Sequence, residues 1–326
     1  MTLRPSVLCP VDFSDGSRGA LRYAAALAEY LKTELTVVTV TDPLLTEAAE
    51  LSSAVAHLPE TVRKELYRFC EDTFEHTLTC KGIRFEVATG KPAVEILRLA
   101  HDGPADVIVM STHGLTGMRK LFFGSTTERV LRETTVPILL TPAHDHGPTG
   151  FDDIRRAVRR VLVPVDLTAA TFDQVVAARD VAAVLDVPVL LAHVVEPVHF
   201  AVSGLPHLPS IEVERRFRAE KALGELAFTI PANLRPEALV AYGDPAEEIA
   251  KVARDRDAGL IVIGLHASSL LGPRMGSVTY RVLCLTSTLV LALPPGIAAA
   301  RLRQAAAQAD RESQQAAGPT GATVTG

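Results

Sequence analysis

The feature that most constrains this chain is an internal repeat. The segment VLCPVDFSD at residues 7–15 returns as VLVPVDLTA at residues 161–169. Three further segments return in the same order: 89–100 as 242–253, 106–114 as 259–267, and 123–131 as 275–283. The spacing between equivalent residues falls only from 154, between Asp12 and Asp166, to 152, between Gly124 and Gly276. Four ordered matches at nearly constant spacing indicate a tandem duplication, so both halves must share one fold.

The repeat divides the chain into four predicted parts. Its 326 residues are enough for two domains of about 150 residues each. A polar stretch that contains glycine and proline separates the copies, and the residues after the second copy lose their apolar periodicity. We predict a first domain at 1–145, a linker at 146–158, a second domain at 159–296 and a flexible tail at 297–326. His144 and His146, near the seam, have no further ligand cluster beside them, so we interpret them as linker residues rather than a metal site.

Composition excludes several classes of partner. The net charge of −5 provides no basic footprint for nucleic acid, and no apolar run reaches the ~18 residues of a membrane span. The N-terminus does not resemble a signal peptide, and Cys9, Cys70, Cys80 and Cys284 form no CxxC pair. Cys9 and Cys284 lie in apolar runs and are predicted to be core residues. These features predict a cytoplasmic protein that does not act on nucleic acids or membranes.

Each half alternates between short apolar strands and helical segments. In the first half, SVLCPV is followed by a segment whose apolar residues recur every three or four positions, then by the β-rich run ELTVVTV. The second half repeats this order, with its longest predicted helix at 210–228. Such alternation predicts an α/β fold: two tandem copies of a five-stranded, mainly parallel sheet with helices on both faces.

The segment STHGLTGMRKLFFGST, residues 111–126, follows the fourth predicted strand and leads into a helix. Its glycines permit close approach of the backbone to a ligand, and free amides at a helix N-terminus bind phosphate. A second interpretation is a turn with a capping box, in which Ser125 and Glu128 satisfy the helix terminus without a ligand. The segment is neither a Walker A loop nor a GxGxxG fingerprint.

Asp12 ends the first predicted strand and poses a similar choice. Asp12, Ser14 or Ser17 can cap the helix that follows. Alternatively, the Asp12 carboxylate at the sheet edge can accept hydrogen bonds from ribose hydroxyls or from an adenine amino group. Because ligands of open α/β sheets bind at the carboxyl ends of the strands, Asp12 and residues 111–126 are placed to share one ligand.

Together these motifs resemble the universal stress protein family in its tandem two-copy form. The resemblance rests on PVDFSDGS (10–17), TGKPAVEIL (89–97), ADVIVMSTHG (105–114), FGSTTERVL (123–131) and VPILL (136–140). It implies a Rossmann-like fold of the adenine-nucleotide alpha-hydrolase type, and an adenine nucleotide as ligand, foremost ATP with or without Mg²⁺. It also implies a regulatory stress-response role.

ATP-binding members of this family carry the pattern G-x2-G-x9-G-[S/T]. Here Ser111, Gly114, Gly124 and Ser125 fall on it, with serine in place of the first glycine. The resemblance implies three groups of contacts: adenine and ribose at Pro10, Asp12 and Val40; the sugar–phosphate path at Met110, Ser111, His113 and Gly114; and the phosphates at Gly124, Ser125 and Thr126. Gly117 lies outside the pattern and is assigned to the turn.

The second copy departs further from the same pattern. Asp166, Gly264, Gly276 and Ser277 are retained. Ala267 replaces the second glycine, and the loop is one residue shorter and contains Pro273. A β-carbon where backbone meets phosphate is an obstacle. We therefore predict that the first copy is the better nucleotide site and that the second is weaker or structural.

The sequence offers no convincing catalyst. His113 is the best acid–base candidate, but a lone histidine beside a glycine is also an ordinary loop residue. Slow ATP hydrolysis stays open. The rival function is an interaction module that binds protein partners or a different small ligand, and a third is an enzyme on the same scaffold.

The fifth predicted strands bear on assembly. In this family the last strand commonly pairs across a dimer interface. The segments at 134–142 and 286–295 can satisfy that pairing within one chain, which predicts an intramolecular pseudo-dimer, with a homodimer of whole chains as a further option.

Overall fold

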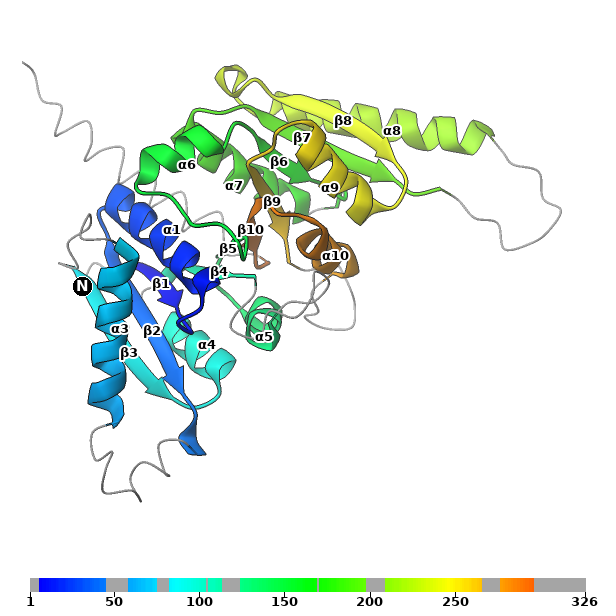
Figure 1. Cartoon of the computed structure of the whole chain (residues 1–326). Helices are drawn as coiled ribbons and strands as arrows, with labels where there is room; N and C mark the ends of the chain where they lie inside the picture. Colours follow the sequence, from blue (N-terminus) through cyan, green and yellow to red (C-terminus); the bar gives the residue numbers. More distant parts are fainter. Residues whose placement is uncertain are drawn as a thin grey trace, which may run out of the picture.

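The computed structural model describes residues 6–44, 58–74, 82–103, 105–112, 124–168, 170–197, 209–265 and 276–295. Both copies alternate strands and helices as predicted (Figure 1). The first copy consists of β1 (Ser6–Pro10), α1 (Asp15–Leu31), β2 (Glu34–Thr41), α3 (Leu58–Phe74), β3 (Ile83–Thr89), α4 (Pro92–Asp102), β4 (Ala105–Ser111), α5 (Ser125–Glu133) and β5 (Ile138–Thr141). The second copy consists of β6 (Val161–Pro164), α7 (Ala170–Leu185), β7 (Val189–Val195), α8 (Pro209–Phe228), a 3₁₀ turn (Ala232–Leu234), β8 (Glu237–Tyr242), α9 (Pro245–Asp255), β9 (Leu260–Gly264), α10 (Ser277–Leu285) and β10 (Leu289–Leu293).

The ten strands form one continuous sheet in the order β3-β2-β1-β4-β5-β10-β9-β6-β7-β8. All pairs within each copy are parallel. At the centre, β5 and β10 pair antiparallel, with Leu139 opposite Leu291 and Leu140 opposite Val290. The predicted pairing of the two fifth strands within one chain is therefore present, and it joins the two five-stranded sheets into one.

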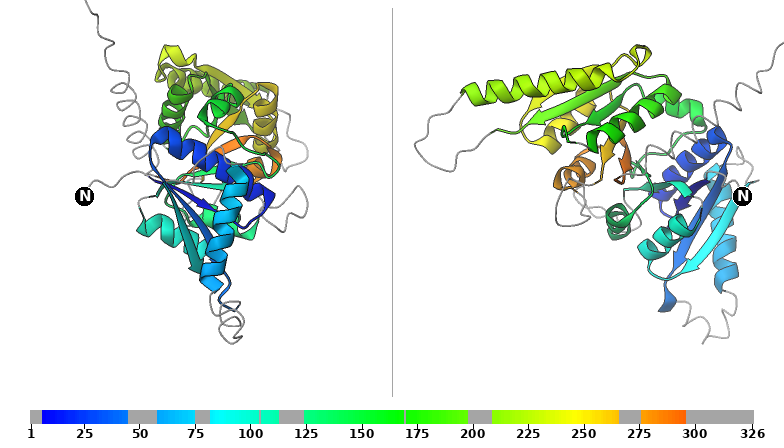
Figure 2. Two further views of the ribbon diagram at one scale, coloured as in Figure 1. Left: turned by 60° about the vertical axis from the view of Figure 1, so that its left-hand side comes forward. Right: turned by 180° about the vertical axis from the view of Figure 1, so that it is seen from behind.

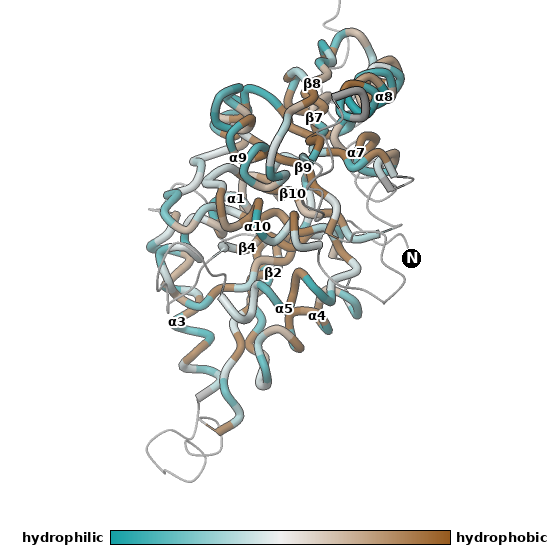
Figure 3. Tube along the Cα trace, turned by 90° about the vertical axis from the view of Figure 1, so that its right-hand side faces the viewer, coloured by the Kyte–Doolittle hydropathy of each residue, from teal (hydrophilic) through white to brown (hydrophobic). Residues whose placement is uncertain are grey.

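Helices cover both faces of this sheet (Figures 1 and 2). Side chains alternate across each strand, so Val7 and Cys9 of β1 face a core formed with α1, α3, α7 and α8. Leu8, between them, faces the opposite core formed with α4, α5, α9 and α10. Hydrophobic residues concentrate along central strands such as β9 and β10 (Figure 3). The result is the three-layer α/β arrangement that alternation of strands and helices predicts.

The predicted linker contains a short helix, α6 (Phe151–Ala157), that packs on the sheet junction. Ile154 is buried, and the Phe151 ring stacks on Tyr30 of α1 with 3.8 Å between ring centroids. The prediction of a polar linker at 146–158 did not include this helix. One buried residue, Ile154, and one partly buried ring, Phe151, are too few in seven residues for a periodic signal.

The two cysteines that were predicted to be core residues differ in burial. Cys9 is fully buried, and burial, followed by the neighbouring Cys70, raises the pKa of its thiol. Cys284 is half-buried on α10, so its prediction as a core residue is only partly met.

Across the described ranges, no group of three or more histidine, cysteine or acidic side chains is arranged to hold a metal. None of the helices that the structure describes has the length and apolar content needed to cross a membrane.

Candidate functional site

The carboxyl ends of β1, β2 and β4 surround a cavity of about 310 Å³ in the first copy. Eight of the ten residues predicted for this copy line it: Pro10, Asp12, Val40, Met110, Ser111, Gly124, Ser125 and Thr126. His113 and Gly114, together with Gly117, lie outside the described residues. Parallel strands end at one edge of the sheet, which is why residues about 100 positions apart in the sequence meet here.

Seven further residues line this cavity that are not among the ten predicted site residues: Val11, Ser17, Val38, Thr39, Pro92, Ile96 and Thr127. Val38, Thr39 and Val40 are consecutive residues near the carboxyl end of β2. Because Val40 was already predicted as a site residue, its two neighbours were candidates for the same cavity wall. Pro92 begins α4, directly after the TGK segment that the repeat had already singled out. Ile96 follows one helical turn later, so the helical period would have identified it.

The structure shows which residue caps α1 and which residue faces the cavity in the turn around Asp12. Ser14 caps α1, because its hydroxyl accepts from the Ser17 amide at 3.2 Å. Asp12 Oδ1 accepts from the Ser14 amide at 3.2 Å, from the Ser14 hydroxyl at 2.6 Å and from the Ser17 hydroxyl. Phe13 between them has φ +65°, so this network holds a strained turn in place. Asp12 therefore braces the turn while it lines the cavity.

The N-terminus of α5 contradicts the predicted capping box. Gly124 is the N-cap residue and provides no side-chain cap, and Ser125 is already the first helical residue. Glu128 pairs instead with Arg132, one turn further along the helix. The capping-box interpretation is wrong because the helix starts one residue earlier than it requires. The first amides of α5 thus have no side-chain acceptor among the described residues, and the helix dipole makes this end favourable for an anion.

Ser111 departs from the family's glycine without cost to the backbone. It ends β4 in an extended conformation and is not one of the residues with positive φ. The Thr127 hydroxyl donates to the Ser111 carbonyl oxygen at 3.2 Å, and the Thr112 amide donates to Thr141 O at 3.1 Å. The backbone at this position therefore has no need of a glycine.

The second copy repeats the acidic turn. Asp166 Oδ1 accepts from the Thr168 amide at 3.0 Å and from the hydroxyls of Thr168 and Thr171 at 2.7 and 2.9 Å. Leu167 has φ +60°, as Phe13 does in the first copy. Burial tends to raise the pKa of Asp166, but the hydrogen bonds from Thr168 and Thr171 outweigh burial and lower this pKa overall.

This turn predicts a pH-dependent contribution to stability. Replacing Asp166 by alanine is expected to lower the free energy of unfolding at pH 7 by about 1 kcal/mol. Because the folded-state pKa is lowered, the wild-type advantage is complete above the ordinary aspartate pKa and disappears as the pH falls through the folded value. Urea unfolding of both proteins at pH 7 and at about pH 3 checks this. A difference in stability that widens toward acid would contradict it.

In the second copy, two residues differ from the residues that line the cavity at the equivalent positions of the first copy. His193 of β7 stands where the first copy has Thr39, and its Nδ1 lies 2.8 Å from Val165 O. Val278 stands where the first copy has Thr126. Gly276 is the N-cap of α10 and, like Gly124, has no side-chain cap. Asp166, Gly264, Gly276 and Ser277 are all placed by the structure, whereas Ala267 and Pro273 lie outside the described residues.

Both copies of the repeat match a known protein family. The model of the Universal stress protein family matches residues 4–142 and again residues 157–294. The chain belongs to the universal stress protein family. The family domain occurs twice, as the repeat predicted.

Two relatives match this chain over about the length of one copy, and one solved structure matches it over most of its length. Universal stress protein YxiE of Bacillus subtilis is 30% identical over 144 residues, covering 41% of this chain and 96% of the relative. A universal stress protein of Methanocaldococcus jannaschii is 26% identical over 149 residues, covering 41% and 92%. The solved structure of a universal stress protein from Archaeoglobus fulgidus covers 89% of this universal stress protein and 98% of its own chain. Its TM-score is 0.60 at 21% identity, so it shares the two-copy fold.

Proposed function

We propose that the first copy of this universal stress protein binds an adenine nucleotide, with ATP as the preferred form. The observation that carries the proposal is the cavity between the Asp12 turn and the uncapped N-terminus of α5. Its two ends differ in chemistry as the two ends of a nucleotide do. Its volume of about 310 Å³ lies within the ~300–1,000 Å³ range of small-molecule sites.

The apolar end of the cavity suits a purine base. Val38, Met110 and Ile96 are buried hydrophobic residues that line it, with Val40 and Pro92 beside them. These side chains come from three different elements, so they form a slot with walls rather than a flat surface. Asp12 stands at the rim of this slot, where a carboxylate can accept from ribose hydroxyls.

The opposite end suits phosphate. The first amides of α5 and the hydroxyls of Ser125 and Thr126 are all donors, and a helix N-terminus binds phosphate without a charged side chain. Mg²⁺ fits this site as a companion of the triphosphate rather than as a protein-held ion. We accordingly propose ligand-dependent regulation in the cytoplasm rather than turnover.

We propose that the second copy binds nucleotide more weakly or not at all. The His193 ring replaces a threonine that lines the cavity in the first copy, and Val278 removes a hydroxyl at the phosphate end. Asp244 takes the place of Lys91, where it caps α9 and pairs with Arg281 at 2.5 Å. The cation at this position in the first copy is therefore replaced by a carboxylate that forms an ion pair within the second copy.

The test is to find the ligand directly. We expect protein purified without added nucleotide to release an adenine nucleotide on denaturation, at about one molecule per chain, as detected by mass spectrometry. Calorimetric titration of ligand-free protein with ATP and Mg²⁺ should give a single strong site. Absence of both the released nucleotide and the calorimetric signal would overturn the proposal, and two equivalent sites would overturn the asymmetry.

A further inference from the structure

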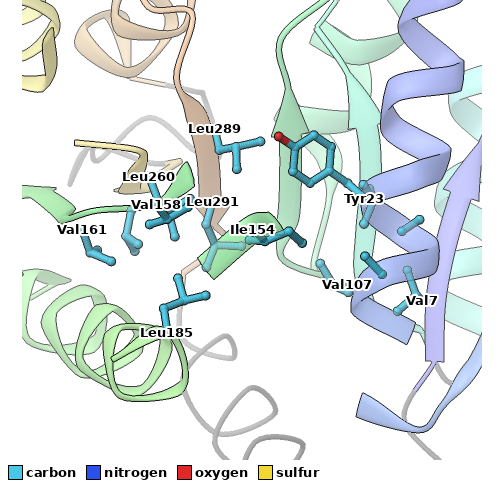
Figure 4. Close-up of a cluster of buried hydrophobic side chains, with 14 of the residues drawn as sticks. Val7, Tyr23, Val107, Ile154, Val158, Val161, Leu185, Leu260, Leu289 and Leu291 are labelled. Carbon is cyan, nitrogen blue, oxygen red and sulfur yellow. The ribbon is translucent and has the colours of Figure 1, made fainter. Parts of the chain in front are cut away.

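A second cavity, of about 130 Å³, lies between the two copies and is separate from the nucleotide cavity. It lies beside the β5–β10 pair, between α1 and α7, and α6 closes one side. Leu139 and Leu291, which face each other across the antiparallel pair, form its floor. Figure 4 shows Tyr23, Ile154, Leu289 and Leu291 gathered at this junction. The wall is almost wholly apolar.

The cavity arises from a mismatch between the two copies. Helices α1 and α7 are equivalent at a spacing of 154 residues, because each is followed by a left-handed residue, Lys32 with φ +49° and Asp186 with φ +56°. At this spacing Val184 is the equivalent of Tyr30, and Val181 is the equivalent of Leu27. All four side chains line the cavity. The first copy thus contributes larger groups, and the second leaves the corresponding space open.

Hydrogen bonds and ring stacking fix the positions of the helices that form the cavity walls. The Tyr23 hydroxyl donates to Asp145 Oδ2 at 2.7 Å. Arg155 of α6 donates to the Val184 carbonyl oxygen from Nη2 at 2.6 Å and from Nε at 3.2 Å, which ties α6 to α7. Together with the stacking of Phe151 on Tyr30, these contacts fix three sides of the cavity. Collapse of the void would break them, so filling it with a ligand is the less costly way to bury its surface.

The lining of the cavity limits the chemistry of that ligand. The lining residues that the structure describes include no lysine, arginine or histidine, so an anion such as a fatty acid carboxylate would lose its hydration without a cation to replace it. The Thr33 hydroxyl is buried behind this apolar surface and has no hydrogen-bond partner, so it presents no polar contact to the cavity. The volume is close to that of the engineered cavity of ~150 Å³ that binds benzene.

We propose that this inter-copy cavity binds a small, neutral, apolar molecule of about one aromatic ring. The ligand would contact both copies at once. Because it binds the folded, paired state alone, it would stabilise the junction between them. This inference does not depend on nucleotide binding by the first copy.

The test uses the full chain and three probes of similar size: toluene, phenol and benzoate. Saturation-transfer NMR should detect binding of toluene and phenol, and each should raise the Tm by at least about 2 °C near saturation. Benzoate should bind at least tenfold more weakly. Phenol should bind more weakly than toluene, because its hydroxyl group would lose its hydration without a polar partner in the cavity wall.

A cavity-filling variant locates the site. Val184→Tyr restores the residue that the first copy already has at this position, and it should abolish binding of both neutral probes. Val213→Tyr makes the same change on an exposed position of α8 and should leave binding unchanged. Val181→Leu adds one methylene and should weaken toluene binding several-fold, which keeps the test decisive if the tyrosine variant does not fold. Failure of the wild type to bind either neutral probe, or equal binding by V184Y and V213Y, would overturn the proposal.

Discussion

Replacing Gly124 by valine is expected to lower the affinity of the first copy for ATP by about 100-fold, or about 2.7 kcal/mol. Gly124 has φ −58° and ψ 138°, a conformation open to every residue, so the substitution adds no backbone strain. The loss comes from the isopropyl group, which enters the space beside the first amides of α5. Calorimetric titration with ATP in the presence of Mg²⁺ measures the change, and an unchanged Tm would show that the fold is intact.

Gly276→Val is the matched control for this result. Gly276 has φ −59° and ψ 142°, so it occupies the same conformation at the start of α10. If the second copy contributes little affinity, this variant should bind ATP as the wild type does. Full affinity in the Gly124 variant would mean that phosphate binds elsewhere, and equal losses in both variants would mean that the two copies bind alike.

Replacing Val290 by aspartate is expected to destabilise the protein by about 4 kcal/mol or more. Val290 is 1% exposed and lies opposite Leu140 in the antiparallel pair that joins the copies. A carboxylate here must be buried without a cationic partner or must open the central pair. Urea unfolding should show a lower midpoint, with separate transitions for the two copies once their junction is weakened.

Leu239→Asp provides the comparison within the same sheet. Leu239 is half-buried on β8, the strand at the edge of the second copy. A charge at this position can reach water, so the loss should be no more than about 2 kcal/mol. Equal destabilisation by the two variants would show that the β5–β10 junction contributes no more to stability than an edge strand does.

The fold was predictable because two independent signals agreed. Short apolar strands alternated with amphipathic helices, and the repeat required the same solution twice. Helix α4 carries clear local signals, since a proline stands at its start and apolar residues recur along it at helical spacing. Helix α6 escaped prediction because its stability comes from contacts with α1 and α7 rather than from its own sequence.

The residues that line the cavity of the first copy were more predictable than its local geometry. Pro10, Val40 and Met110 meet because parallel strands end together, a property of topology that the sequence pattern implies. The role of Ser125 depended on a helix boundary shifted by one residue, and sequence patterns do not resolve boundaries that finely. Thr39 and Ile96 line the cavity only because of how β2 and α4 are oriented, and the sequence does not specify which of their side chains face it.

The antiparallel pairing of β5 with β10 has a consequence for how the two halves can diverge. Two separate subunits would part on dilution and would also form pairs of like with like. Joined in one chain, the halves meet at a fixed one-to-one ratio at any protein concentration, and the first half always faces the second. A substitution on one side of the junction therefore meets one known surface rather than a copy of itself. Each half is free to specialise without losing its partner.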